Sequence, residues 1–539
     1  MKLVPVLIAG GGPVGMTLAC ELSRRGIECM LVERNATTTR YPKMDITNAR
    51  SMELFRRLAL VDALRSVAVP EDNNFDVSWV TSLTGHELHR FRYSSVNEWR
   101  RLIRENNDGS MPGEAPMRVS QVEIEPVLQR AVQALPGVEA QWGVSLEELM
   151  QDMEGVTVTL RASHATVEDV RCYYLVGCDG GTSQVRHCLG IRLDGQARVM
   201  DRFLVHFRST AHHVLQHFGV AWHYQSPKGT LIAQNDRDIW TFQARFPRDI
   251  APEKIDAGAM LRDFAGHDFD YEILLASAWT PHLLVAERYA VGRVFLAGDA
   301  AHQYIPTGGY GMNTGIADAC DLAWKLAALV QGFGGPGLIQ SYDAERRPVG
   351  LRNRQASGRH TEVRLAIAQA YAEAGNSLEE PSPEADTRRA ALASRIAALG
   401  NAENESYGIE LGYAYRQSPI VGAETDAEIS DDPVRYIPTT APGARLPSVL
   451  FADGSALFDR LGPWFTLIAF GTAPDAELVA AARRLGMPLE VVRVDEPALE
   501  HIYRAPQVLV RPDQHVAWRG RNAAAKADAI IARCLGWRV

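Results

Sequence analysis

The first residues suited to chemistry lie near the start of the chain, in the run Gly10-Gly11-Gly12-Pro13-Val14-Gly15. This run fits the pattern G-x-G-x-x-G, in which the first glycine permits a tight turn, the second lets the backbone approach a pyrophosphate, and the third lets a helix pack on a sheet. Glu33 follows about 20 residues later, where a carboxylate accepts hydrogen bonds from ribose hydroxyls. We therefore predict a dinucleotide site formed by Gly10, Gly12, Pro13, Gly15, Glu33 and Arg34.

The elements that must position this site are a strand, a helix and a second strand. Residues 4–9 form an apolar segment, residues 14–25 suit a helix, and residues 28–33 are again strand-like. This order is a βαβ unit of the usual ~30 residues. It places the pyrophosphate at the helix N-terminus, where free N–H groups and the helix dipole favour negative charge. The pattern alone does not distinguish NAD from FAD.

Two later runs make that distinction. The run Tyr174-Leu-Val-Gly-Cys-Asp-Gly-Gly-Thr-Ser-Gln-Val-Arg186 resembles the "DG" motif of the flavoprotein aromatic hydroxylases. The run Gly292-Arg-Val-Phe-Leu-Ala-Gly-Asp-Ala-Ala-His302 resembles their "GD" motif and continues into Pro306-Thr-Gly-Gly-Tyr-Gly-Met-Asn313. With the glycine turn, these motifs cover residues 3 to about 350 in the family's order. The chain therefore resembles the class A flavoprotein aromatic hydroxylases of the phenol and 2,4-dichlorophenol hydroxylase type, which bind FAD.

The resemblance assigns the cofactor contacts. Asp299 would follow a buried strand and accept hydrogen bonds from the ribityl hydroxyls of FAD. The glycines after Pro306 would let the backbone lie flat against the isoalloxazine, and a helix opening near residues 312–313 would direct its positive end toward the flavin. The further FAD contacts that the family implies fall on Gln121, Val144, Asp179, Gly180, Gly309, Gly311, Met312 and Asn313.

The resemblance also implies the reaction. Because the sequence holds a single dinucleotide fingerprint, NAD(P)H, with NADPH favoured, would bind transiently, reduce the flavin and leave. Reduced flavin would take O₂ to a C4a-hydroperoxide that hydroxylates a phenolic ring ortho to its hydroxyl. A Baeyer–Villiger or epoxidising reaction on a polyketide-like substrate remains an alternative, as does a catalytically silent flavoprotein. A flavin-dependent halogenase is disfavoured because its W-x-W-x-I-P run is missing.

A base near the substrate hydroxyl would aid this reaction. The first candidate is Asp45, in a segment (42–53) that resembles the one passing close to the flavin in phenol hydroxylases; the alternative is a helix-terminal residue or a partner of Arg50. Pro306 would lie at the same reactive end of the flavin. Strands between 200 and 245 should form the substrate wall, although core packing is the commoner role for a single histidine or aromatic residue on such a strand. The candidates on this wall are the possible bases His213, His223 and Tyr224 and the possible stacking residues Trp222 and Phe242.

The organisation of the chain predicts an α/β protein with a Rossmann-like FAD-binding domain, an antiparallel substrate sheet and a thioredoxin-like C-terminal domain. The predicted boundaries are 1–190 and 291–400 for the two parts of the FAD domain, 191–290 for the substrate sheet and 440–539 for the C-terminal domain. Cys534 is the one cysteine of the C-terminal domain, which excludes thiol–disulfide chemistry there. We expect this domain to have a structural role, such as dimerisation.

The composition narrows the class of protein. A net charge of −9 over 539 residues argues against a nucleic-acid binder, which needs a basic face. No run approaches the ~20 apolar residues of a membrane span, and residues 3–9 lead into the glycine turn without a cleavage site. The seven scattered cysteines show no metal-ligand spacing and suit a reducing compartment. We expect a cytoplasmic homodimer that acts on a small phenolic substrate.

Overall fold

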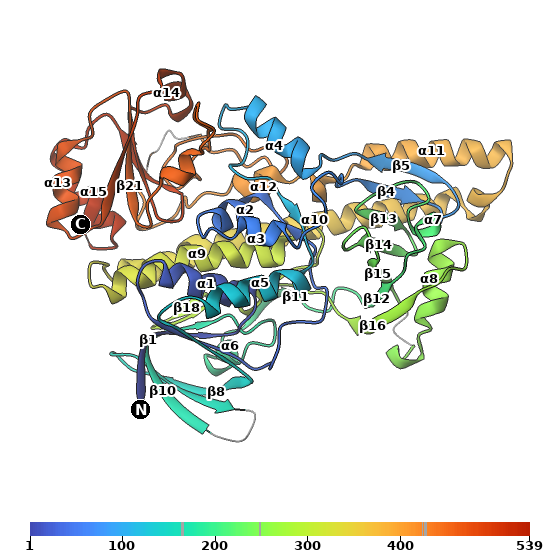
Figure 1. The fold of residues 1–539 in the computed structure, drawn as a ribbon, viewed down its shortest axis with the longest axis horizontal. Helices are drawn as coiled ribbons and strands as arrows, with labels where there is room; N and C mark the ends of the chain where they lie inside the picture. Colours follow the sequence, from blue (N-terminus) through green and yellow to red (C-terminus); the bar gives the residue numbers. More distant parts are fainter. Residues whose placement is uncertain (163–166, 247–249, 423, 425–427, 539) are drawn as a thin grey trace.

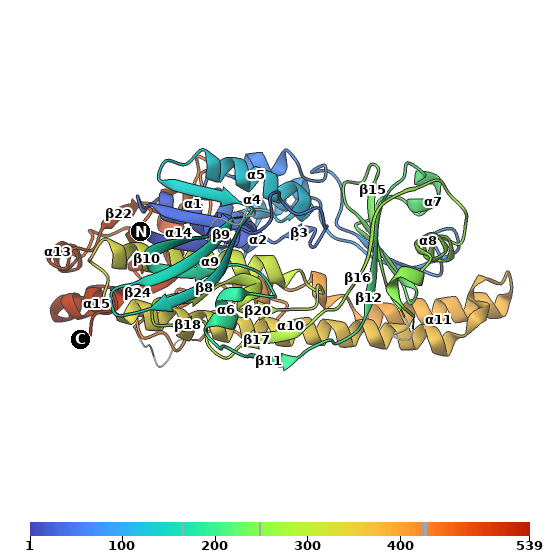
Figure 2. The same ribbon diagram turned by 90° about the horizontal axis from the view of Figure 1, so that it is seen from below.

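The computed structural model describes residues 1–162, 167–246, 250–422, 424 and 428–538. Figure 1 shows a body built on a parallel sheet at the lower left, a second sheet at the right and a C-terminal body at the upper left. A single long helix, α10 (Gly337–Ala374), runs from the parallel-sheet body to the second sheet, as Figure 2 shows from below. The architecture is the mixed α/β type that the sequence predicts.

The parallel sheet has the strand order β18-β19-β10-β1-β2-β7, with β9 attached antiparallel to β10 and β8 attached to β9. Helices α1 and α9 pack against each other beside it, and residues 6–9 of β1 and 29–32 of β2 are apolar and buried, as expected for strands covered on both faces. The bounds are β1 Lys2–Ala9, α1 Pro13–Ser23, β2 Cys29–Glu33, α5 Gln121–Gln133, β7 Val138–Trp142, β8 Val144–Gln151, β9 Val156–Ala162, β10 Val167–Gly177, α6 Gln184–Cys188, β18 Ala290–Val291, β19 Val294–Leu296 and α9 Tyr310–Val330.

The second sheet has seven strands in the order β16-β12-β15-β14-β13-β4-β5. Most neighbours are antiparallel, as predicted, but β13 and β4 pair in parallel. The sequence analysis did not foresee that β4 and β5, from residues 77–91, would extend a sheet formed mainly by residues 202–279. The bounds are β4 Val77–Val80, β5 Glu87–Phe91, β12 Arg202–Arg208, α7 His212–Leu215, β13 His223–Ser226, β14 Gly229–Ala233, β15 Ile239–Arg245, α8 Ala257–Ala265 and β16 Glu272–Trp279.

Alternation along these strands gives the second sheet two different faces. One face carries Phe203, Tyr224 and Phe242, which form an apolar cluster with residues of α8. The opposite face carries Arg202, His223 and the other residues that alternate with this cluster, and it faces α10 and a cavity.

Short strands and helices connect the two sheets, and others pack against α10. Helix α11 packs against both α10 and β5, so the far end of α10 is fixed to the second sheet. The bounds are β3 Ile46–Thr47, α2 Ala49–Arg56, α3 Val61–Arg65, α4 Val96–Glu105, β6 Met117–Arg118, β11 Leu193–Gln196, β17 Leu283–Ala286, β20 His302–Gln303, α11 Pro383–Leu399, η4 Ala402–Asn404 and α12 Tyr407–Leu411.

The C-terminal body is a four-stranded sheet with the order β22-β21-β23-β24 and helices on both faces. Leu467 of β21 packs in the cluster that contains residues of α13 and α15, whereas its neighbour Ile468 packs in the cluster that contains residues of α14. The bounds are β21 Phe465–Phe470, α13 Ala476–Arg484, β22 Leu489–Val494, α14 Pro497–Tyr503, β23 Gln507–Val510, β24 Val516–Gly520 and α15 Ala527–Cys534.

A buried ion cluster joins the C-terminal body to α9 and α10. Arg511 follows β23 and binds Glu345 of α10 (Nη1–Oε1 2.7 Å) and Asp321 of α9 (Nη2–Oδ1 2.9 Å). Lys325 also binds Asp321, and the side chains of these four residues are at most 1% exposed. Because burial removes the hydration of each charged side chain, the stability of each charge depends on its oppositely charged partners.

We predict that Arg511→Met destabilises the protein by about 3–5 kcal/mol, because it leaves three buried carboxylates, Asp321, Glu345 and Asp513, with Lys325 as the remaining cation of the cluster. Arg484→Met is the control within the same body. It breaks an ion pair with Asp528 whose side chains are 50% and 62% exposed, so the loss should stay below about 1 kcal/mol. Thermal unfolding of the two variants tests this, and equal losses would contradict it.

Candidate functional site

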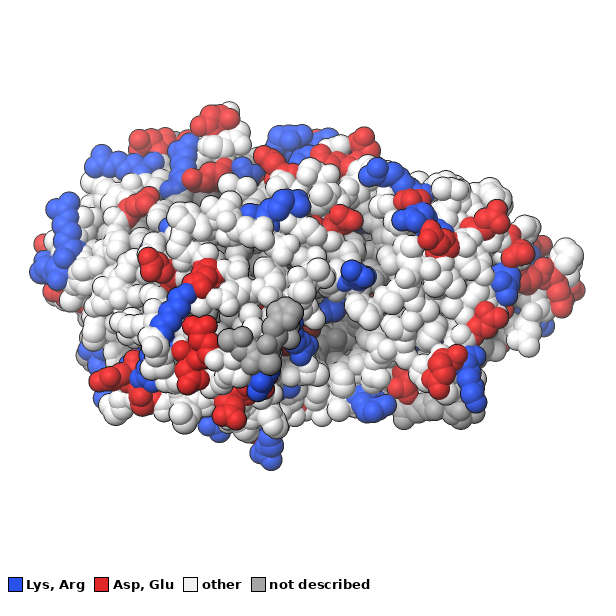
Figure 3. Space-filling view, turned by 60° about the horizontal axis from the view of Figure 1, so that its bottom comes forward, with Lys and Arg blue, Asp and Glu red and all other residues white. Residues whose placement is uncertain are grey.

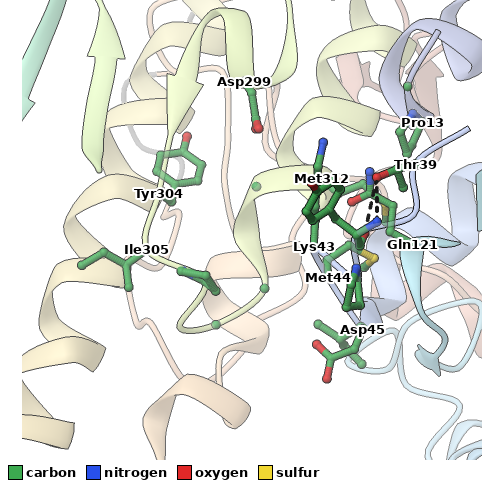
Figure 4. Close-up of a pocket in the computed structure, with 18 of the residues that line it drawn as sticks. Pro13, Thr39, Lys43, Met44, Asp45, Gln121, Asp299, Tyr304, Ile305 and Met312 are labelled. Atoms are coloured by element: carbon green, nitrogen blue, oxygen red, sulfur yellow. Dashed lines mark hydrogen bonds between the residues drawn. The ribbon is translucent and has the colours of Figure 1, made fainter. Parts of the chain in front are cut away.

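A cavity of about 960 Å³ lies between the carboxyl edge of the parallel sheet and the polar face of the second sheet. Figure 4 shows that Asp299 and Asp45 enter it from opposite ends of the view, with Met312 between them. In the space-filling view of Figure 3, acidic and basic side chains are interspersed over the visible face. The polar groups that distinguish the site are therefore those inside the cavity.

The glycine turn has the geometry that a pyrophosphate needs. Gly10 has φ +114°, and a Cβ there would meet the carbonyl oxygen of Cys178 at 2.2 Å. A Cβ on Gly15 would meet the carbonyl oxygen of Gly10 at 2.0 Å, whereas one on Gly12 would meet nothing within 4 Å. Gly12 is the N-cap of α1 and provides no side-chain cap, so the helix terminus opens into the cavity beside Pro13.

Two carboxylates flank this turn. Glu33 ends β2, and its Oε2 accepts a hydrogen bond from the N–H of Gly11 at 2.8 Å. Asp179 Oδ2 accepts from the N–H groups of Gln184 (2.7 Å) and Val185 (3.1 Å), while its Oδ1 is buried without a partner among the described residues. Burial raises the pKa of Asp179. An orphan carboxylate oxygen in the cavity wall fits a hydroxyl donor from a ligand.

The remaining nucleotide-side predictions also reach the cavity system. Gln121 begins α5 and donates from Nε2 to Oε1 of Glu125 at 2.7 Å. Val144 lies at a smaller adjoining hollow together with Glu33 and Arg34. The predicted cofactor residues that line the main cavity are Gly12, Pro13, Glu33, Arg34, Gln121, Asp179, Gly180, Asp299, Gly309, Gly311 and Met312.

The start of α9 forms another part of the cavity wall. This helix begins at Tyr310, three residues earlier than the sequence suggests, with Gly309 (φ +65°) as its N-cap. A Cβ on Gly311 would lie 3.8 Å from Asp299 Oδ1, so the carboxylate lies over the first turn of the helix. Asp299 is accessible from the cavity and receives no hydrogen bond from the described residues; the surrounding protein atoms raise its pKa.

Asp45 enters the cavity from the side opposite Asp299 in Figure 4, on a segment that packs against the start of α9. Its Oδ2 accepts a hydrogen bond from Trp222 Nε1 at 2.6 Å and lies 3.5 Å from His223 Nε2. Burial raises the pKa of Asp45, but His223, Trp222 and the charge of Arg118 outweigh it, so the net pKa is lowered. The alternative partner suggested by the sequence is excluded, because Arg50 binds Glu53 instead.

The segment bearing Asp45 is held to α9 by Asn313. Asn313 donates from Nδ2 to the carbonyl of Ile46 at 3.1 Å and accepts the N–H of Asn48 at 3.1 Å. Asn313 is not among the residues that line the cavity, and its side chain positions the segment that carries Asp45. These bonds fix the distance between Asp45 and the helix terminus that faces the cavity. The contact of Asn313 with the cofactor stays a prediction.

Three candidates for the substrate wall are placed elsewhere. Tyr224 and Phe242 are buried on the face packed against α8, and the Tyr224 hydroxyl donates to the carbonyl of Gly219. His213 is exposed on α7 and does not line the cavity. Since side chains alternate along a strand, a step of one residue moves a side chain to the other face. His223 and Gln243 therefore line the cavity where Tyr224 and Phe242 cannot.

The sequence analysis missed part of the wall opposite the parallel sheet. Arg202 and Gln243 come from β12 and β15 of the second sheet, whereas the others come from α10 and from segments around 93–99 and 403–410, which no local motif connects to residues 200–245. Among them, Glu410 has a pKa that burial raises to about 8. The missed residues include Tyr93, Trp99, Arg202, Gln243, Arg364, Glu403, Tyr407 and Glu410.

A glycine turn with open helix termini, two carboxylates at strand ends and a separate sheet that closes the cavity define a flavin-nucleotide protein with its own substrate wall. Residues 3–357 match the model of the FAD binding domain, and residues 439–537 match that of the aromatic-ring hydroxylase C-terminal domain. The chain belongs to the flavin-dependent aromatic hydroxylases, which confirms the predicted resemblance and fold class.

Individual relatives agree with this assignment over nearly the whole chain. The chain is 37% identical to the FAD-dependent monooxygenase apdD of Emericella nidulans, covering 99% of this chain and 90% of the relative. It is 30% identical to phenol 2-monooxygenase of a Pseudomonas strain, covering 98% and 91%. The solved structure of the flavin-dependent monooxygenase PieE with FAD and substrate aligns with a TM-score of 0.88 at 30% identity, covering 99% of both chains.

Among the described residues, no helix is both long and apolar enough to cross a membrane.

We predict that Asp299→Ala yields a folded protein that purifies largely without flavin, because the variant lacks the free carboxylate at the start of α9. Asp268→Ala, at an exposed position outside the cavity, is the matched control and should retain full flavin content. The ratio of flavin absorbance to protein absorbance measures this. Yellow holoprotein in normal yield from Asp299→Ala would refute the assigned contact.

Glu410 predicts a pH dependence of stability. The folded protein holds its proton up to about pH 8, whereas an unburied glutamate releases it near 4.5. Stability is therefore lost as pH rises through this window, at up to about 1.4 kcal/mol per pH unit from this group. The melting temperature of the wild type should fall relative to that of Glu410→Gln between pH 6 and 8. A constant difference across that range would contradict the buried acid.

Proposed function

We propose that the protein uses NAD(P)H and O₂ to hydroxylate a phenolic aromatic substrate, ortho to the phenolic hydroxyl. The glycine turn, Glu33, Asp179 and Asp299 would hold FAD, which would supply the chemistry that activates O₂ for transfer of one oxygen atom to the ring. The observation that carries the proposal is the free carboxylate oxygen of Asp45, held beside the start of α9.

Asp45 suits the role of acceptor for the substrate's hydroxyl. Its Oδ2 is occupied by Trp222 and lies near His223, whereas its Oδ1 has no hydrogen bond from the described residues. Because its lowered pKa keeps Asp45 ionised at neutral pH, Oδ1 accepts a hydrogen bond from the phenol. Drawing the proton toward the carboxylate enriches the ring in electrons, which promotes attack by an electrophilic oxygen.

The walls near Asp45 exclude water from the ring. Phe75, Trp222 and Ile232 are buried in one apolar cluster, and Trp99 packs against it. All four line the cavity on the side of the second sheet. An aromatic substrate enclosed by these side chains loses contact with solvent.

The Rossmann-like fingerprint occurs once and is accounted for by the glycine turn at the FAD pyrophosphate. We therefore propose that the nicotinamide binds transiently, with NADPH the reductant to be tested before NADH. This part of the proposal is supported by the family resemblance and by the accessible cavity edge at Arg40 and Lys43.

The direct experiment supplies the purified holoenzyme with NADPH or NADH and a panel of monocyclic and polycyclic phenols. Expected results are faster flavin reduction with a suitable phenol and a product heavier by one oxygen, with the new hydroxyl ortho to the first. Reduction that is equal with every phenol, without oxygenated product, would overturn the proposal. A lactone, ester or epoxide from a ketone or alkene substrate would assign the alternative oxygenation.

We predict that Asp45→Ala retains flavin reduction but lowers hydroxylation by about 10²-fold, the usual scale for loss of a general base. Asp45→Asn preserves the shape without the charge and should show a similar loss. Product formed per NADPH, together with the stopped-flow rate of flavin reduction, separates these two steps. Unchanged product per NADPH in both variants would make Asp45 a purely structural residue.

A further inference from the structure

A cation without a partner lies in the cavity wall away from Asp45. Arg202 begins β12, and its side chain lines the cavity. Within the described ranges, no carboxylate forms an ion pair with it and no side-chain hydrogen bond satisfies it. Burial together with the charges of Arg364 and Arg245 lowers the pKa of Arg202 to about 10.

Two other arginines are neutralised by the protein: Arg364 in the cavity wall, and Arg118, which lies over the rings of Phe75 and Trp222 in that wall. Arg364 of α10 binds Glu403 through two nitrogens, with Nε–Oε1 at 3.0 Å and Nη2–Oε1 at 2.6 Å. Arg118 binds Asp236 at 3.0 Å. Glu403 attracts Arg202 as well, but Arg364 already occupies both of its oxygens. Arg202 is half-buried and lines the cavity, so an anion that enters the cavity can pair with its guanidinium without displacing a carboxylate of the protein.

A second polar group lies beside Arg202. In the sheet, Arg202 pairs directly with Arg245 of β15, and Gln243 lies two residues away on the same face. Such diagonal neighbours have Cα atoms about 7–8 Å apart, within reach of long side chains. Gln243 also lines the cavity, and its amide can donate to the anion that the guanidinium binds.

We propose that Arg202 and Gln243 bind a carboxylate on the substrate, at the end remote from the hydroxyl held by Asp45. The inference rests on the proposed function only for the identity of that hydroxyl end. A planar carboxylate matches the paired donors of a guanidinium.

The position of Arg202 also sets the size of this substrate. His223, beside Asp45, is on β13, and three strand spacings separate β13 from β12. At about 4.8 Å each, these amount to about 14 Å. A single phenol ring is too short to occupy both ends, so the substrate class is a polycyclic phenol that carries a carboxylate.

The test compares two ligands that differ only in charge, a hydroxyanthraquinone carboxylic acid and its primary carboxamide. Binding to the oxidised holoenzyme is followed by the change in the flavin absorbance spectrum, which needs no turnover. The wild type should bind the acid about 10–100-fold more tightly, the range expected for hydrogen bonds to a charged group. Arg202→Gln should reduce this ratio below about 3-fold, and Arg202→Lys should restore part of it.

Arg245→Gln is the matched control, because it removes a neighbouring positive charge from an exposed position outside the cavity. It should leave the ratio unchanged, and flavin content should be normal in all variants. Equal binding of acid and amide by the wild type, or a ratio that survives Arg202→Gln, would overturn the subsite.

The outcome for the proposed function is read separately, from oxygenated product with uncharged phenols. If these are hydroxylated while the acid shows no advantage, the subsite fails and the proposed function stands. If no phenol is oxygenated but binding of the acid depends on Arg202, the subsite stands and the proposed function fails.

Discussion

The parallel pairing of β19, β10, β1 and β2 is the constraint on which the cofactor half of the site depends. Ala9 of β1 is level with Gly177 of β10 and Val32 of β2, and Gly177 is level with Leu296 of β19. The four strands therefore end at one edge of the sheet. Each is followed within three residues by a cofactor-side group, or ends in one: Gly10, Glu33, Asp179 and Asp299. Parallel register, more than any single contact, brings together residues that are up to 289 positions apart in the sequence.

This half of the molecule could be predicted because its signals are local. A strand, a glycine turn and a helix N-terminus are each recognised from a pattern of a few neighbouring residues. Their order determines which edge of the sheet they share. Asp45 was predicted from the resemblance of segment 42–53 to phenol hydroxylases, and the structure places it in the cavity wall on a segment that α9 holds in place. The start of α9 was misplaced by three residues because Gly309 caps the helix from a left-handed conformation that the sequence does not announce.

The substrate half could not be predicted to the same depth. The expected strands are present between 200 and 245, but nothing local says which of two adjacent residues faces the cavity. The predicted wall residues therefore include His223 and Trp222, which line the cavity, and Tyr224 and Phe242, which face the core instead. The opposite wall depends on long-range packing. Arg364 comes from a helix whose other end is fixed by the ion cluster at Glu345 and Arg511, and no motif links it to the sheet it covers.

The two faces of the second sheet have a consequence for how this enzyme can change. Positions 202, 223, 230, 232 and 243 all line the cavity, while the residues between them pack against α8 and hold the layer together. Residues that face the ligand cavity and residues that stabilise the fold thus alternate along the same strands. Gene duplication or laboratory evolution can diversify the first set without touching the second, and the nucleotide edge lies in a separate sheet. A scaffold divided in this way can acquire new substrates while its oxidative chemistry is inherited unchanged.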